Sequence, residues 1–328
     1  VLWLENFLLS CKLTVLFVSH DEALLSRTAT SILLLERLRR RQVPRATLYR
    51  MGYDQFYAER GAAFEKQTRI ARKEREDFDA KMERYDAIRR KVERDQNAIS
   101  RQDPHGSRLL KKKMHTVQAM GRRFEREQEN MTAMPEQEEA IFAKLDCAPL
   151  PADKTVLDLS CAELSVGGRT LCRNIRLTVR ANEKLCICGH NGVGKSTLLH
   201  LIRDALKKRA DLRVFYMPQD AGDLLDFSLS PVELLSPSGE KEERSRAGIL
   251  LGSMKFTADE MNHPSAGLSG GQKAKLMFLM MAQSGANVLL LDEPSRNLSP
   301  LSGPVIRELL AEYPGCIIAV SHDRRLIR

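Results

Sequence analysis

One nine-residue run constrains the fold of this chain more than any other feature. Residues 189–197 read Gly-His-Asn-Gly-Val-Gly-Lys-Ser-Thr, directly after the apolar run Lys184-Leu185-Cys186-Ile187-Cys188. The apolar run predicts a buried strand, and the residues from Lys195 onward predict a helix. Strand, glycine-rich loop and helix in this order indicate an α/β domain.

The loop also has the composition of a phosphate-binding site. Glycines let successive backbone N–H groups turn toward an anion, and the helix N-terminus adds partial positive charge. A lysine at the end of the loop reaches the β- and γ-phosphates of a nucleotide, and the following hydroxyl coordinates Mg²⁺. The nucleotide-binding residues expected from this pattern are Gly189, Asn191, Gly192, Gly194, Lys195, Ser196 and Thr197.

A second apolar run, Val288 to Leu291, ends in the carboxylates Asp292 and Glu293. A run of this kind predicts a buried parallel strand. Asp292 at its end suits a contact to Mg²⁺ through water, and Glu293 suits a base that orients or deprotonates an attacking water. An apolar strand ending in two acids is usually structural, but its position after a phosphate loop favours a catalytic role.

Between these motifs, Leu268 is followed by Ser269, Gly270, Gly271 and Gln272. Ser269 is expected to cap a helix over Lys273 to Met281, with glycine amides that form a second anion-binding helix end. Taken alone, the run would indicate only an ordinary capped helix.

The tetrapeptide Val-Ser-His-Asp occurs twice, at residues 18–21 and 320–323. A repeat at so long a period indicates two related domains. Residues 1–36 predict a helix (Leu2 to Ser10), a strand (Thr14 to Val18), a short helix (Asp21 to Ser26) and a strand (Ser31 to Leu35). We therefore expect residues 1–48 to be the C-terminal remnant of a first α/β domain, and residues 153–328 to be a second, C-terminally clipped one.

The intervening residues 49–140 differ in character. Two sets of apolar residues step by 4, 3, 3, 4 and 7, which is a heptad-like stripe on each of two helices. The helix-breaking run Asp103-Pro104-His105-Gly106 separates them and predicts an antiparallel helical hairpin, or arm, of the coiled-coil type. A plain solvated spacer is the alternative. The stripe residues are Phe78, Met82, Tyr85, Ile88, Val92 and Ile99, then Leu110, Met114, Val117, Met120, Phe124 and Met131.

Basic residues gather at the tip of this hairpin, against the single acid Asp103. A net charge of +9 indicates an anionic partner, either nucleic acid or a membrane surface. A basic cluster confined to the tip favours contact with a phosphate backbone. The candidate RNA-contacting residues are Arg101, Arg108, Lys111, Lys112 and Lys113.

Cysteine spacing and hydropathy limit the class of protein further. Seven cysteines without metal-type spacing fit a reducing compartment, so we expect a cytoplasmic protein. No run approaches the roughly 18 to 20 apolar residues of a membrane span.

Together these motifs resemble those of the ATP-binding cassette (ABC) proteins. Residues 189–197 correspond to the Walker A loop, Leu268 to Gln272 to the signature motif, and Asp292 and Glu293 to the end of the Walker B strand. Gln219 matches the Q-loop and His322 the switch histidine. Two cassettes joined by a charged helical hairpin resemble the ABC-F subfamily, whose members are ribosome-associated translation factors and antibiotic-resistance proteins.

The resemblance implies specific roles. Catalysis is expected to involve Glu293, His322 and Gln219, with Mg²⁺ held by Ser196, Gln219 and Asp292. The signature loop is expected to act in trans, on the nucleotide of a second ABC domain that pairs head to tail. The arm is expected to approach rRNA and tRNA on the ribosome.

Two positions depart from the family pattern. The acid of the D-loop is replaced in Pro294-Ser295-Arg296-Asn297-Leu298-Ser299, and the aromatic residue that stacks on adenine is replaced near Val166. We expect an α/β ABC-type P-loop ATPase domain with a helical subdomain, preceded by the arm and the remnant, that hydrolyses ATP and acts on the ribosome. The alternatives are the ATPase subunit of an ABC transporter, or a degenerate nucleotide-binding fragment without turnover.

Overall fold

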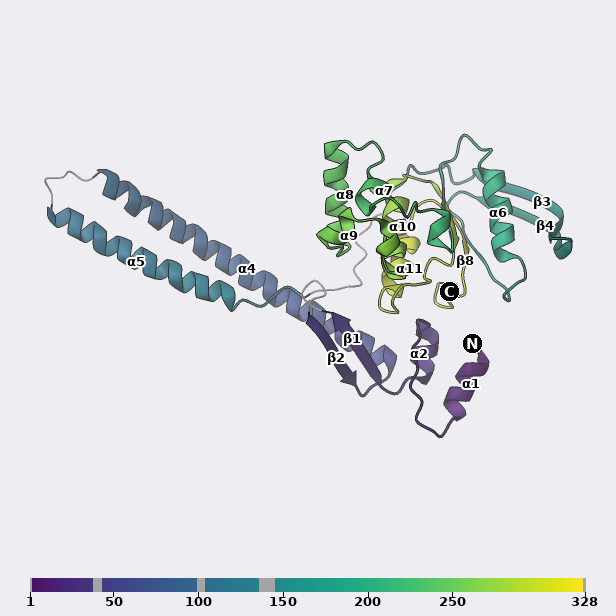
Figure 1. Ribbon diagram of the computed structural model, residues 1–328, viewed down its shortest axis with the longest axis horizontal. Helices are drawn as coiled ribbons and strands as arrows, with labels where there is room; N and C mark the ends of the chain where they lie inside the picture. The colour runs from purple at the N-terminus through teal and green to yellow at the C-terminus, as the bar shows by residue number, and fades with distance from the viewer. Residues whose placement is uncertain (1, 38–42, 99–103, 136–144, 327–328) are drawn as a thin grey trace. The chain divides into compact units, whose positions relative to one another are not determined.

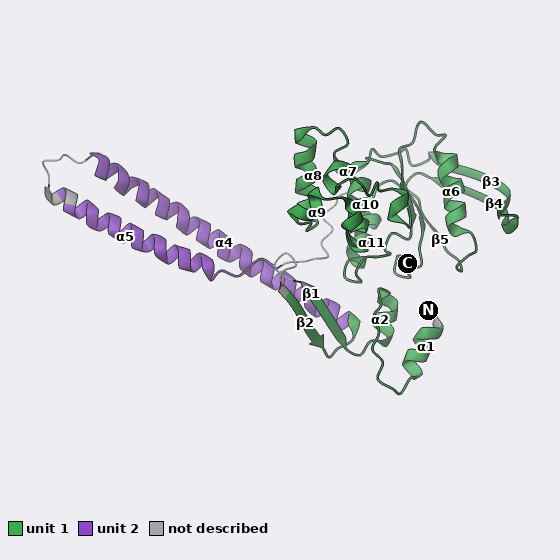
Figure 2. Ribbon diagram, viewed as in Figure 1, with its two compact units in different colours: residues 1–53, 137–328 green, residues 54–136 purple. Residues whose placement is uncertain are grey.

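The computed structural model describes residues 2–37, 43–98, 104–135 and 145–326. Many of its helices and strands are labelled in Figure 1. The chain divides into two compact units, one made of Val1–Tyr53 with Gln137–Arg328 and the other of Asp54–Glu136 (Figure 2). The finer division into a first-domain remnant, an arm and a second domain stays a prediction.

A parallel sheet forms the centre of the first unit. Its strand order is β5-β8-β7-β6, and each neighbouring pair is parallel. Side chains alternate between its two faces because successive strand residues point in opposite directions. The strands are β5 (Lys184–Ile187), β6 (Val214–Met217), β7 (Val288–Asp292) and β8 (Cys316–Val320).

Each face of the sheet is covered. On one face Val288, Leu290 and Ile318 pack with α6 (Lys195–Leu206) and with residues of the antiparallel hairpin β3 (Thr155–Val166) and β4 (Arg169–Arg180). On the other face Leu289 and Leu291 pack with α10 (Gly270–Gln283) and α11 (Gly303–Glu312). Helices on a parallel sheet confirm the predicted α/β fold class.

Short helices fill the segment between β6 and α10, where a helical subdomain is expected. Leu235, Leu251 and Met254 from this segment are fully or almost fully buried. They belong to the same hydrophobic core as the buried residues of α10. The elements are η1 (Ala221–Asp223), α7 (Pro231–Leu235), α8 (Lys241–Ser253), α9 (Ala258–Asn262) and η2 (Ser265–Gly267).

The first 53 residues agree with the prediction only in part. Helix α1 (Leu2–Ser10) forms as expected, and α2 (Glu22–Thr28) follows Asp21, whose side chain caps it. The expected strand Thr14 to Val18 is wrong: these described residues form no strand, and Val18 is 94% exposed. An apolar run needs a hydrogen-bonding neighbour to become a strand, and none of the described segments pairs with it.

The expected strand near Ser31 does form, as β1 (Ile32–Arg37), but its partner was not predicted. Strand β2 (Val43–Tyr49) pairs antiparallel with it. The run Val-Pro-Arg-Ala-Thr-Leu-Tyr lacks a clear apolar alternation, so only the pairing reveals the strand. Strand β3 is continuous from Thr155 to Val166, because β4 pairs along its whole length with two register shifts.

The second unit consists of two helices, α4 (Tyr53–Ala98, apart from its first residue) and α5 (Pro104–Glu129). Phe124 stacks edge-on against Phe78 and Tyr85, with ring centroids 6.3 and 5.6 Å apart. Near the other end Gln96 Nε2 donates to Leu110 O at 3.5 Å. Contacts whose residue numbers rise on one helix and fall on the other define an antiparallel hairpin, as predicted.

The break between the helices differs from the prediction. Pro104, His105 and Gly106 lie in the first turn of α5 rather than between helices, because proline is favoured at the first helical position. Asp103, Ile99 and Arg101 lie outside the described residues. Arg108, Lys111, Lys112 and Lys113 are exposed on α5. Within the described ranges, no helix combines the length and apolarity that crossing a membrane requires.

Candidate functional site

The glycine loop joins β5 to α6, as its sequence predicts. Gly192 and Gly194 have φ of 80° and 98°, which side-chain-bearing residues rarely adopt. A Cβ at Gly194 would also lie 2.8 Å from Leu171 Cδ1. Lys195 Nζ donates to Gly189 O at 3.0 Å and to His190 O at 2.9 Å, so the lysine closes the loop on itself.

The two carboxylates and the histidine meet at the ends of neighbouring strands. Asp292 ends β7 opposite Val320 of β8. Glu293 follows with φ 53°, and its N–H donates to Val320 O at 2.9 Å. The N–H of His322 donates to Glu293 Oε2 at 3.2 Å, and His322 Nε2 lies 3.5 Å from Glu293 Oε1. The left-handed backbone at Glu293 is local strain of the kind that collects at functional sites.

These elements surround one open cleft of about 660 Å³. It holds most of the residues that the sequence singles out, although they come from four separate parts of the chain. Gly189 contributes through the carbonyl that accepts from Lys195. The predicted residues in its lining are Asn191, Gly192, Gly194, Lys195, Ser196, Thr197, Gln219, Asp292, Glu293 and His322.

The carboxylates of Asp292 and Glu293 are suited to binding a cation. Asp292 is 3% exposed, and among the described residues neither its Oδ1 nor Glu293 Oε1 has a hydrogen-bond partner. Burial raises the pKa of Glu293 and the charge of Asp292 adds to this, while His322 and Lys195 oppose it. A buried carboxylate oxygen left without a donor suits a cation.

The residues beside Asp292 fit Mg²⁺ in particular. Ser196 and Gln219 line the same cleft and add a hydroxyl and an amide oxygen, the ligand types that Mg²⁺ prefers. Within the described chain no group of three His, Cys, Asp or Glu side chains could hold a metal by itself. The remaining ligands would therefore be water and phosphate oxygens.

The predicted cap of α10 is confirmed, although the helix starts at Gly270 rather than Lys273. Ser269 Oγ accepts from Gln272 N–H at 3.3 Å, and Gln272 Oε1 accepts from Ser269 N–H at 2.8 Å. This motif does not line the Lys195 cleft as the structure describes it. Ser269, Gly271 and Gln272 instead line a second cleft, of about 860 Å³, together with His20.

Some residues of the Lys195 cleft were not predicted to bind nucleotide. Arg169, Leu171 and Arg296 line it, and Arg296 N–H donates to Glu293 O at 3.0 Å. Val166, where the adenine-stacking aromatic was expected to be replaced, also lines the cleft and is 53% exposed. The β3–β4 hairpin brings Val166, Arg169 and Leu171 there, and no local motif indicates this.

The raised pKa of Glu293 predicts a pH-dependent stability difference. The folded state disfavours the ionised carboxylate, so stability is lost as pH rises from the ordinary glutamate range through the raised pKa. The thermal midpoint of the wild type should therefore fall relative to Glu293→Gln as pH rises above the ordinary glutamate range. Thermal unfolding followed by circular dichroism measures this difference.

Glu233→Gln is the matched control, with the opposite sign. A hydrogen bond from the Ser230 side chain, with one from its backbone, lowers the pKa of Glu233. The wild type should then gain stability relative to Glu233→Gln as pH rises. An identical pH response of the two variants would contradict the raised pKa of Glu293.

Residues 172–296 match a known protein family described as "ABC transporter". Across nearly the whole chain there is similarity to three curated proteins. They are ABC transporter F family member 5 of Arabidopsis thaliana (27% identity, 99% of this chain), human ATP-binding cassette sub-family F member 3 (28%, 100%) and the probable ATP-binding protein YheS of Escherichia coli K12 (26%, 100%).

The chain spans less than half the length of these relatives, 44%, 44% and 48% respectively. Among solved structures it is similar to the ATP-binding cassette MJ0796 in a dimeric post-hydrolysis state bound to ADP and Pi, with 21% identity and a TM-score of 0.42 over 51% of this chain and 87% of that one. It is similar to cbiO1 from Clostridium perfringens, with 24% identity and a TM-score of 0.40 over 52% and 80%. Residues 172–296 thus match the ABC transporter family, and the chain as a whole is similar to proteins named as ABC-F members.

Proposed function

We propose that this chain binds ATP with Mg²⁺ in the Lys195 cleft and that the protein hydrolyses it. The observation that carries the proposal is the meeting of Lys195, Asp292, Glu293 and His322 around one cleft. A phosphate loop, an unpaired buried carboxylate and a carboxylate of raised pKa form a set with complementary chemical roles.

Binding would rest on the loop and the start of α6. The backbone N–H groups of residues 189–195 and the helix N-terminus would receive the phosphates. Lys195, whose amine now donates to two loop carbonyls, would turn toward the β- and γ-phosphates. Bound Mg²⁺ would neutralise charge on the phosphates, held by Ser196, Asp292 and Gln219.

Hydrolysis would depend on Glu293 and His322. A carboxylate with a raised pKa holds a proton more readily, so Glu293 suits orienting or deprotonating the attacking water. His322 is half-exposed at the cleft, where its backbone N–H donates to Glu293 and its ring Nε2 lies 3.5 Å from Glu293 Oε1. Its ring would turn from Glu293 toward the γ-phosphate. Gln219 would sense the same phosphate from the end of β6.

Completion of the site would require a signature loop from another ABC domain. Among the described residues, the chain's own signature residues line the cleft with His20 and not the Lys195 cleft. We propose that Ser269, Gly270, Gly271 and Gln272 act in trans, by head-to-tail pairing with a second ABC domain.

For the arm we propose contact with ribosomal RNA or tRNA. Arg108, Lys111, Lys112 and Lys113 are exposed on one short stretch of α5, and such clusters bind phosphate backbones without reading sequence. A role in translation or in antibiotic resistance, in the cytoplasm, follows from the same proposal.

Steady-state ATP hydrolysis tests the first proposal. Glu293→Gln should lower kcat on the order of 100-fold or more while the chain still binds ATP. Lys195→Ala should lose binding as well, because it removes the cation facing the phosphates. Phosphate release by the wild type no faster than that of the two variants would reject turnover by this chain and would favour a non-hydrolysing nucleotide-binding fragment.

Co-sedimentation with ribosomes tests the second proposal. Changing Lys111, Lys112 and Lys113 together to Glu should weaken binding at least tenfold at moderate salt and flatten its salt dependence. A matched triple variant on α4, Arg69→Glu, Arg72→Glu and Lys73→Glu, changes charge equally away from the tip. Equal binding by the wild type and both variants would remove the tip from the mechanism.

A further inference from the structure

The repeated Ser-His-Asp run forms the same turn in both copies. The N–H of Asp21 donates to Ser19 Oγ at 3.0 Å, and the N–H of Asp323 donates to Ser321 Oγ at 3.0 Å. Each aspartate then accepts from the N–H two residues on, at 2.9 Å in both cases. The repeat is therefore a structural unit that presents its histidine in a fixed local setting.

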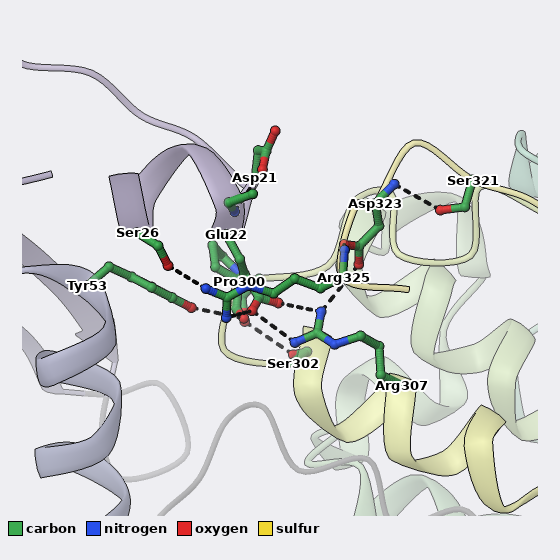
Figure 3. Close-up of polar contacts among 12 residues, drawn as sticks. Asp21, Glu22, Ser26, Tyr53, Pro300, Ser302, Arg307, Ser321, Asp323 and Arg325 are labelled. Carbon is green, nitrogen blue, oxygen red and sulfur yellow. Dashed lines mark hydrogen bonds and ion pairs between the residues drawn. The ribbon is translucent and has the colours of Figure 1, made fainter. Parts of the chain in front are cut away.

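The residues after each turn carry opposite charge and pair with one another. Glu22 accepts from Arg307 through both of its oxygens at 2.9 Å and from Arg325 Nη1 at 3.1 Å (Figure 3). Arg325 also donates to Ser26 Oγ on α2. Arg324 pairs with buried Glu5 of α1, and its hydrogen bond, with a second from Arg27, holds the pKa of Glu5 below its ordinary value.

Glu22 is built into this position. Its side chain is 5% exposed, and the paired Arg307 side chain is 17% exposed. A Cβ at Gly303, at the start of α11, would lie 1.9 Å from Glu22 Oε1. The Glu22 carboxylate therefore occupies the space that a side chain at position 303 would fill. From there it contacts both Arg307 and Arg325.

A short series of contacts connects Glu22 to the Lys195 cleft. Arg307 holds Asp323 Oδ2 at 3.3 Å, and Asp323 closes the turn that contains His322. The N–H of His322 in turn donates to Glu293. A buried carboxylate on α2 is thus three contacts away from the proposed catalytic base.

We propose that Glu22 is a positioning residue for His322: through Arg307, Arg325 and Asp323 it fixes the turn that presents the histidine to the γ-phosphate. Glu22 thereby influences the rate of hydrolysis without touching the nucleotide. The effect on rate rests on the proposed function, whereas the effect on the His322 ring does not.

Two readouts on the full chain test this inference. The first is the NMR signal of the His322 ring in protein carrying ¹³C-labelled histidine, assigned by its loss in His322→Asn. The second is the ATPase reaction resolved into kcat and KM. Glu22→Gln should shift the His322 signal and lower kcat by ten- to a hundredfold, with KM for ATP within about twofold.

Glu22→Asp keeps the charge but shortens its reach, so it should give a smaller shift and a smaller loss of kcat. If Glu22→Gln does not fold, Glu22→Asp serves as the test variant in its place. Arg27→Gln is the matched control, because Arg27 lies on the same helix and its ion pair with Glu5 does not involve Glu22 or Asp323. It should leave both readouts unchanged.

An unchanged His322 signal in folded Glu22→Gln or Glu22→Asp protein would overturn the inference. So would a rise in KM with kcat unchanged. If the wild type hydrolyses no ATP, the proposed function fails, and the position of the His322 signal still decides whether Glu22 acts on the turn.

Discussion

The parallel pairing of β5, β8 and β7 is the constraint on which the site depends. In a parallel sheet all strands end at the same edge, so whatever follows each strand meets there. Ile187 and Asp292 are both in register with Val320. The glycine loop, Glu293 and His322 therefore lie at the same edge of the sheet. In the sequence, Gly189 and His322 are 133 positions apart.

The buried carboxylates of the first unit fall into two classes, and the difference explains their roles. Glu5 and Glu22 each contact two arginines, so their charges are compensated and hold α1 and α2 to the end of the chain as described. Asp292 Oδ1 and Glu293 Oε1 have no hydrogen-bond donor among the described residues. A carboxylate between two arginines has its charge compensated, whereas a buried carboxylate oxygen without a donor leaves free energy to be gained from a ligand.

Prediction from the sequence succeeded where a motif is local. Residues 184–197 predict strand, loop and helix through an apolar run followed by glycines and a lysine, and Ser269 caps its helix through a residue three positions away. It failed where a tertiary partner decides. The apolar run at Thr14 reads as a strand but forms none, and Val166 and Arg169 reach the cleft only through the pairing of β3 with β4. The contacts of Glu22 depend on the space at Gly303, which no sequence pattern marks.

Calorimetric titration with ATP and Mg²⁺ tests the central claim, that the strand ends form one nucleotide site, most directly. Gly194→Ala introduces a Cβ at φ 98° and 2.8 Å from Leu171, without changing charge. Gly61→Ala in α4 is its matched control, since a Cβ there meets no atom within 4 Å among the described residues. We predict one site per chain, retained in Gly61→Ala and weakened at least tenfold in Gly194→Ala. Equal affinity of all three proteins, or no binding by the wild type, would contradict the account.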